Sequence, residues 1–261
     1  GFPRYDRLGR RNPLDPFTMG FMRVALAGLF GLPVLAWAGR RGLAGFLDKD
    51  VWILAFLNAF AVTLLHIGMA LTTASKTSLL INVNIAFVAI LSVWILRESL
   101  GPRQVAGVGL SLAGVVLLAT GGDPTSLRGG EATGDAFVFT SAILAAVSIV
   151  YTKRLLERHH ALTLAVSVLL MASLPLAASM FFLGGPVALV PTDWAVMLWL
   201  AGVATLLAVL LWTFGLGGTG ATVSSLLLTV QVIVAASLSV VLLGELLTLV
   251  FVVGGAMILG S

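Results

Sequence analysis

An internal repeat constrains the fold of this chain more than any other feature of its sequence. Residues 74–98 and 221–245 align without a gap at a constant offset of 147 residues, and each segment is an apolar run that ends in glutamate. The matched positions are Ser78/Ser225, Leu79/Leu226, Leu80/Leu227, Val83/Val230, Ser92/Ser239 and Val93/Val240. Internal repeats in apolar chains are typical of membrane transporters, in which a substrate site forms between two repeats that rock against each other.

Composition supports a membrane setting. Apolar residues make up 59% of the chain and charged residues 10%, with a mean hydropathy of +1.09, which is too apolar for an ordinary soluble domain. The net charge of +4 comes from basic residues scattered between apolar spans, so it does not indicate a nucleic-acid surface. Cysteine is absent, which excludes disulfides and thiolate metal sites, and the arginine-rich start lacks the apolar region of a signal peptide.

Nine apolar spans are long enough to cross a bilayer, and they must be helices because open strands leave backbone groups unpaired in lipid. The expected spans are 17–38, 51–71, 77–96, 104–120, 135–152, 161–183, 193–216, 221–243 and 248–260.

The repeat divides the chain into three parts. Residues 1–120 form a first repeat with four spans, residues 121–134 a glycine-rich linker, and residues 135–261 a second repeat with five spans. The repeat mate of the span that begins at Asp135 would lie before residue 1, so we expect a first helix that is missing here and ten helices in all. Five helices per repeat is an odd number, which makes the second repeat inverted relative to the first.

Orientation follows from lysine and arginine in the loops. The set of loops expected to be cytoplasmic holds Arg40, Arg41, Lys49, Arg97, Arg103, Lys153, Arg154 and Arg158. The opposite set holds Arg4, Arg7, Arg10, Arg11, Lys76 and Arg128. This bias places both natural termini in the cytoplasm.

The chain resembles the drug/metabolite transporter superfamily, specifically the EamA-type permeases, over essentially its whole length. The stretches that carry the resemblance are 13–33, 78–118 and 224–248. The matching motif residues are Arg23 early in the family's second helix, Glu98 and Glu245 after its fourth and ninth helices, and Gly107 and Gly114 in the helix after Glu98. The resemblance implies a ten-helix, five-plus-five secondary transporter that moves small metabolites, often outward. Amino-acid exporters of the YddG kind, in the bacterial plasma membrane, are the expected branch.

His66 is the one histidine within an expected span, and Asn58 and Thr63 lie on roughly the same side of that helix. Polar groups in a membrane usually face a cavity or a partner helix. A neutral imidazole can hydrogen-bond a substrate carboxylate or carbonyl, so we interpret these three residues as substrate-facing. The alternative is an interhelical hydrogen bond that holds the bundle together.

Asn82 and Asn84 form the strongest polar pair, and the repeat places Thr229 and Gln231 at the equivalent positions. Ser78 shares a helix face with Asn82, whereas Asn84 points elsewhere because residues two apart do not share a face. These five residues are candidates for substrate contact, with interhelical hydrogen bonding as the alternative.

Ser148, Tyr151 and Trp212 complete the candidate substrate-binding set. Buried tyrosine and tryptophan offer apolar walls with one hydrogen-bonding group and suit an amphoteric solute that carries an ammonium group. Anchoring at the membrane interface is the alternative for Tyr151 and Trp212 and the favoured interpretation for tryptophans near span ends.

The charged residues suggest facilitative transport. Every acidic residue lies in a loop or at a span end, so no mid-membrane carboxylate is available to carry a coupling proton. Arg23 lies about six residues, or about 9 Å, into its span and is interpreted as structural. Glu98 and Glu245 are interpreted as helix-start or turn residues.

These observations predict an all-α integral membrane transporter, without cofactor or metal, that exports amino acids or related metabolites as a monomer. The first alternative is a proton-coupled drug/metabolite antiporter that uses His66 or an acid in the missing helix. The remote alternatives are an intramembrane lipid enzyme, for which no nucleophile and base converge, and a channel or receptor.

Overall fold

The structure, a computed structural model, describes residues 15–39, 45–120, 123–128, 132–184 and 191–228, together with a few isolated residues between 230 and 257. The regular secondary structure of these residues is helical, and no strand occurs among them. The expectation of an all-α chain is therefore confirmed for the described residues.

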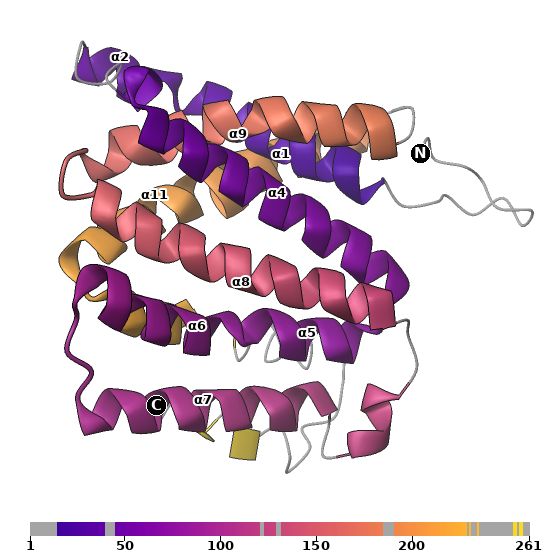
Figure 1. The fold of residues 1–261 in the computed structure, drawn as a ribbon. Helices are drawn as coiled ribbons and strands as arrows, with labels where there is room; N and C mark the ends of the chain where they lie inside the picture. The colour runs from indigo at the N-terminus through magenta and orange to yellow at the C-terminus, as the bar shows by residue number, and fades with distance from the viewer. Residues whose placement is uncertain are drawn as a thin grey trace, which may run out of the picture. The chain divides into compact units, whose positions relative to one another are not determined.

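The helices follow the order of the expected spans (Figure 1). Those before the linker are α1 (Pro16–Phe30), α2 (Leu32–Ala38), α4 (Lys49–Leu71), α5 (Ala74–Asn82), α6 (Asn84–Leu91), the π-helix η1 (Ser92–Leu96) and α7 (Pro102–Thr120). Those after it are the 3₁₀-helix η2 (Pro124–Leu127), α8 (Ala132–Leu155), α9 (Ala161–Leu183), α10 (Pro191–Trp199), the π-helix η3 (Leu200–Leu207) and α11 (Ala208–Gly218). Residues 221–228 are also helical.

Six stretches of the described chain are long and apolar enough to cross a membrane. They are Pro16–Ala38, Lys49–Leu71, Leu79–Leu96, Ala132–Leu155, Ala161–Leu183 and Asp193–Gly218. The expected span at 104–120 forms the shorter apolar helix Pro102–Leu117, and the spans expected at 221–243 and 248–260 lie mostly outside the described residues. The chain is thus a multi-pass membrane protein.

Three of the expected spans are not continuous α-helices. The first is interrupted at Gly31, which ends α1, and Pro33 lies in the first turn of α2, where its missing N–H costs no intrahelical bond. The third is interrupted for one residue at Val83, between α5 and α6. The span at 193–216 passes through the π-helix η3. Pro175, by contrast, lies inside α9 without ending it.

The chain divides into two compact units, each built from residues on both sides of the linker. Unit 1 contains residues 1–66 and 154–217, and unit 2 contains residues 67–153 and 218–261. Each unit is described here by itself.

In unit 1, α1 packs closely against α9 (Figure 1). Glycines make the close approach possible, because a Cβ added at Gly28 would lie 2.7 Å from Leu170 Cδ2 and one added at Gly31 would lie 2.6 Å from Val166 Cγ1. Small residues at such crossings are the usual means by which membrane helices bring their backbones together.

In unit 2, the first turns of α8 are bound to the connection between α4 and α5. The Asp135 carboxylate accepts hydrogen bonds from Thr72 Oγ1 and from Lys76 Nζ, the latter at 2.7 Å. The side chains of Lys76 and Asp135 are 19% and 28% exposed, so water screens their ion pair only in part.

We expect Asp135→Asn to lower the free energy of unfolding by about 1.5–3 kcal/mol, the range for a lost hydrogen bond to a charged group. A double-mutant cycle with Lys76→Met, read as melting temperature in detergent, isolates the pair. The double variant should lose less melting temperature than the two single variants lose together, because it leaves neither charge unpaired. Strictly additive losses would show that Lys76 and Asp135 do not interact energetically.

Candidate functional site

The polar residues of α1 and α4 meet in unit 1. The ring of His66 packs edge-on against Phe17, with ring centroids 5.8 Å apart and an interplanar angle of 87°. Gly20 lies opposite the imidazole, since a Cβ added there would be 3.0 Å from His66 Cε1. The structure therefore places His66 of α4 against α1 and leaves it half-buried.

Asn58 and Thr63, expected to act with His66, bond to their own helix. Asn58 Nδ2 donates to Leu54 O at 3.0 Å, and Thr63 Oγ1 donates to Ala59 O at 2.8 Å. Both side chains stay half-buried and keep their oxygen atoms as acceptors. His66 packs against α1, whereas Thr63 lies in a groove between α4 and α9.

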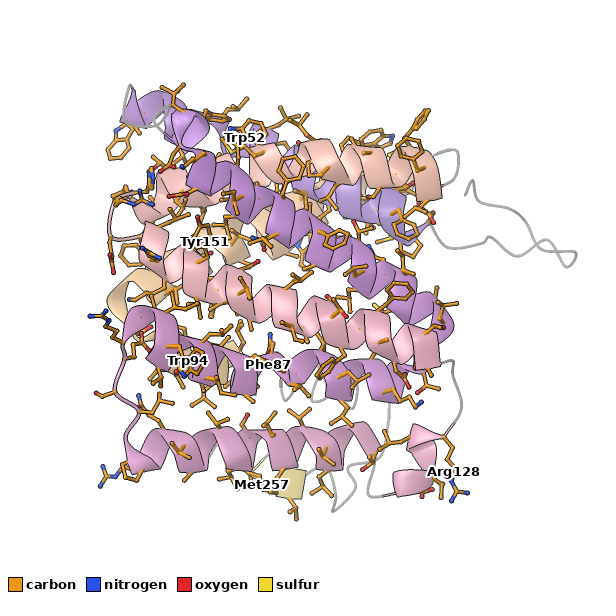
Figure 2. All side chains as sticks on the ribbon, in the orientation of Figure 1. Trp52, Phe87, Trp94, Arg128, Tyr151 and Met257 are labelled. Carbon is orange, nitrogen blue, oxygen red and sulfur yellow. The ribbon has the colours of Figure 1, made fainter. Side chains whose placement is uncertain are left out.

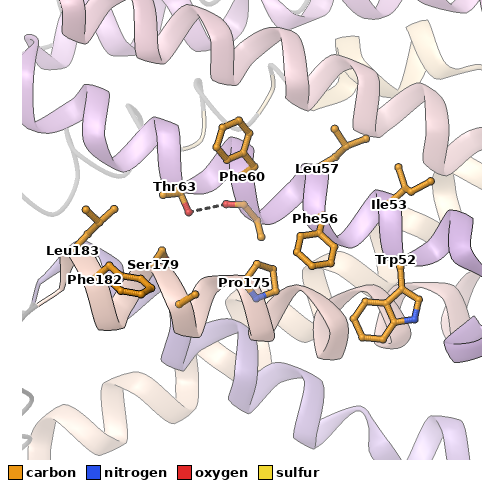
Figure 3. A pocket seen from close by; sticks show the side chains of 12 residues that line it. Trp52, Ile53, Phe56, Leu57, Phe60, Thr63, Pro175, Ser179, Phe182 and Leu183 are labelled. Carbon is orange, nitrogen blue, oxygen red and sulfur yellow. Dashed lines mark hydrogen bonds between the residues drawn. The ribbon is translucent and has the colours of Figure 1, made fainter.

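This groove in unit 1 has a volume of about 850 Å³ (Figure 3). Its wall is apolar, formed from α4 by Trp52, Phe56 and Phe60 and from α9 by Pro175, Phe182 and Leu183, among others. The Thr63 hydroxyl donates within α4, and Ser179 donates to Leu176 O at 2.8 Å. The groove therefore suits apolar groups better than polar ones.

In unit 2, Asn82 and Asn84 flank a break in the helix. Asn82 is the last residue of α5, Asn84 is the first of α6, and Val83 between them has φ −61° and ψ −18°. Both amides are half-buried. The backbone of Val83 stays hydrogen-bonded, since its N–H donates to Leu80 O and its carbonyl accepts the N–H of Ala86. Interruptions of membrane helices form the substrate sites of several transporters.

The same helix continues as the π-helix η1, which ends at Arg97 in the left-handed conformation, with φ 55°. π-Helical turns often occur at functional sites. Trp94, on η1, is 83% exposed, in agreement with its interpretation as an anchor at the membrane surface (Figure 2).

Glu98 lies at the N-terminus of the helix formed by residues 221–228. Its Oε1 accepts the backbone N–H of Ala221 at 3.0 Å, and Ser92 Oγ is 2.9 Å from Thr222 Oγ1. Glu98 was expected to be a turn or helix-start residue; it lies in the connection between η1 and α7, and its negative charge caps residues 221–228 rather than the helix that follows it in the chain. Glu245 lies outside the described residues.

The remaining candidates fall into both units. Ser148 is buried on α8 and its Oγ has no hydrogen-bond partner in the described structure, while Tyr151 is half-buried on the same helix (Figure 2). Trp212 is half-buried on α11 in unit 1. Thr229, Gln231 and the side chain of Ser78 lie outside the described part of the structure. Substrate contact by all eleven candidates stays a prediction.

Arg23, interpreted from the sequence as structural, lies on α1 with a buried Nε. This Nε has no hydrogen-bond partner among the described residues. The signal was present in the sequence as an arginine several residues inside an apolar span, but the position of a long side chain cannot be read from spacing.

An ionic cluster connects the start of α4 to the turn between α8 and α9 in unit 1. His159 Nε2 lies 2.8 Å from Asp48 Oδ2, and Arg158 Nη2 donates to Asp50 Oδ2 at 2.7 Å. The hydrogen bonds from His159 and from the Asp50 backbone N–H, with the nearby charge of Arg158, hold the pKa of Asp48 below its ordinary value.

This depressed pKa predicts a pH dependence of stability. A carboxyl group whose pKa is lower in the folded state stabilises it above the ordinary pKa of about 3.9, and this contribution is lost as the pH falls through the folded value. We expect Asp48→Asn to melt at a lower temperature than the wild type at neutral pH. The loss in the free energy of unfolding should be about 0.2–1 kcal/mol, the contribution of an exposed ion pair. When the melting temperatures of the wild type and of Asp48→Asn are plotted against pH, the two curves should converge below about pH 4. A constant difference at every pH would contradict the expectation.

Comparisons with known proteins identify the class of this fold. The profile of the EamA-like transporter family matches the chain twice, over residues 7–120 and 132–261. An uncharacterized transporter of Archaeoglobus fulgidus is 30% identical over 216 residues, which are 80% of this chain and 73% of the relative. The uncharacterized transporter YetK of Bacillus subtilis is 27% identical over 263 residues, covering 94% and 76% of the two chains.

Structural similarity agrees with these matches. One protein of known crystal structure superposes on this chain with a TM-score of 0.84 and 18% sequence identity, over 95% of this chain and 86% of the other. At this identity the likeness concerns the fold alone. The fold and the family matches together define a membrane transporter rather than an enzyme. The chain belongs to the EamA-like transporter family, within the drug/metabolite transporter superfamily.

Proposed function

We propose that this protein exports small metabolites, most favourably amino acids, by facilitative alternating access. The observation that carries the proposal is the helix break at Val83, flanked by the half-buried amides Asn82 and Asn84. Side-chain amides can recognise an amphoteric solute without adding a fixed negative charge to the site, and interruptions of membrane helices are places where transporters build substrate sites.

The architecture we propose has ten helices in two inverted repeats, residues 1–120 and 135–261, joined by residues 121–134. Two separate matches to one family profile support a duplication at these positions. The first helix would precede residue 1. Both termini would be cytoplasmic, and a monomer in a bacterial plasma membrane would contain the complete site.

We propose transport without proton coupling because the acidic residues of the described helices lie near helix ends. In the described helices Asp50, Asp135 and Asp193 lie in the first turns of α4, α8 and α10, near the membrane surface. The alternative, a proton-coupled antiporter, is favoured by one observation: His66 is a titratable group inside the span Lys49–Leu71.

Counterflow in proteoliposomes tests the proposal. The full-length protein is reconstituted with an unlabelled amino-acid mixture inside, and entry of labelled amino acids is followed with and without an imposed pH gradient. We expect accumulation that ignores the gradient. Accumulation that requires the gradient would establish the antiporter instead, and no movement of any amino acid would exclude this substrate class.

A further inference from the structure

Unit 1 holds a positive charge with an unused hydrogen-bond donor. Arg23 lies on α1, about 10 Å from the start of that helix and inside the candidate span Pro16–Ala38. Its Nε is shielded from solvent and has no hydrogen-bond partner among the described residues. A guanidinium matches a two-oxygen acceptor with parallel N–H bonds. The Nε of Arg23 is therefore available to a ligand that brings its own oxygen atoms.

A second donor lies beside it. Arg23 follows Gly20 by three residues and so lies on a neighbouring part of the same side of α1, the side on which Gly20 and Phe17 meet His66. The charge of Arg23 acts on the His66 imidazole. His66 is half-buried, and an imidazole can donate one hydrogen bond in its neutral form. Two donors from two helices thus lie near one another.

Among the described residues, the carboxylates near this pair lie at the starts of helices. Asp15, the carboxylate that acts on His66, caps α1 by accepting the Thr18 backbone N–H at 3.0 Å. Of the elements that pack against α1, α9 and η3 contain no charged residue, and α10 contributes Asp193 in its first turn. An arginine inside a span is costly without a counter-charge, and such residues mark the paths of anionic solutes by default.

We propose that Arg23 and His66 form the subsite that binds the carboxylate of the transported solute. This inference rests on the proposed transport function and narrows its substrate class to solutes with a carboxylate. Arg23 supplies the charge and the Nε donor, and His66 supplies a second donor whose position is set by Phe17 and Gly20. Amides and esters of the same solutes, which lack the anionic group, are excluded.

Ligand-induced thermal stabilisation of the full-length protein in nanodiscs tests the subsite independently of transport. Three probes share one side chain: L-leucine, isocaproate, which lacks the amino group, and leucinamide, which lacks the carboxylate. We expect leucine and isocaproate to raise the melting temperature of the wild type and leucinamide to leave it unchanged. Arg23→Gln should raise the dissociation constants of both carboxylates by about 10- to 100-fold, the loss of one charge-assisted hydrogen bond.

Two further variants separate binding from stability. Arg103→Gln removes an exposed arginine at the start of α7 and should bind as wild type does. Arg23→Met should melt, without ligand, at or above the wild-type temperature, because it removes an unpaired buried charge. If Arg23 had only a structural role, Arg23→Met would melt at a lower temperature without ligand, and the carboxylate probes would still raise its melting temperature.

Each other result would overturn the proposal. Equal stabilisation by leucinamide and leucine would show that the carboxylate is not recognised, and wild-type affinity in Arg23→Gln would show that Arg23 does not bind it. No stabilisation of the wild type by either carboxylate would show that the subsite does not exist. Carboxylate binding that depends on Arg23, combined with no amino-acid counterflow, would keep the subsite and overturn only the proposed amino-acid export.

Discussion

Replacing Gly68 or Gly134 by valine is expected to destabilise the folded protein by about 3 kcal/mol or more, at the upper end of overpacking substitutions. A Cβ added at Gly68 would lie 2.9 Å from both Gly134 O and Val138 N, and one added at Gly134 would lie 2.9 Å from the Leu71 carbonyl carbon. These are backbone atoms of α4 and α8, so no side chain can rotate to relieve the clash. The helices must separate instead.

The matched control is Gly109→Val on α7, where an added Cβ meets nothing within 4 Å. It introduces the same β-branched residue into a helix and should change the melting temperature little. Melting temperature and the monodisperse fraction in detergent measure both substitutions. If Gly68→Val and Gly109→Val melted at the same temperature, the backbone contact between α4 and α8 would be wrong.

His66→Ala is expected to lower the counterflow rate by about 10-fold or more, the effect of losing a charge-assisted or cavity hydrogen bond. It also removes the ring that packs against Phe17. The variant should still fold, because the imidazole that it removes is only half-buried.

His160→Ala serves as the control for His66→Ala. His160 precedes α9, is exposed, and makes no side-chain capping hydrogen bond, so its loss should leave exchange unchanged. His66→Gln, which keeps a hydrogen-bond donor, should restore part of the activity. Normal exchange by His66→Ala would remove His66 from the substrate path.

The sequence predicted where most membrane spans begin and end, because a span needs only length and apolar composition. It suggested that Glu98 lies at a helix start, but not that the helix would be the one at residues 221–228, because a contact across 123 residues cannot be read from local spacing. It did not predict which side of each span faces inward. In α4 the small Ala55 and Ala59 are buried, whereas Phe56 and Phe60 are 53% and 57% exposed.

This pattern has a physical reason. Lipid is as apolar as a protein core, so small residues mark the packed side of a membrane helix and bulky apolar residues face outward. Hydrophobicity therefore carries no information about the side on which a site lies. The break at Val83 and the π-helices η1 and η3 were missed for a related reason, because they depend on tertiary packing and no glycine or proline marks Val83. Asn82 and Asn84 were singled out as side chains on a continuous helix, whereas they flank the interruption at Val83.

The most direct test of alternating access uses single introduced cysteines, because residues 1–261 contain none. Asn84→Cys places a thiol at the helix break, and Gly109→Cys places a control on the exposed side of α7. Labelling by a membrane-impermeant maleimide is measured from each side of the membrane separately. We expect Asn84→Cys to react from both sides and Gly109→Cys, which faces lipid, to react from neither. A thiol at position 84 that reacts from one side only, or not at all, would contradict alternating access at this break.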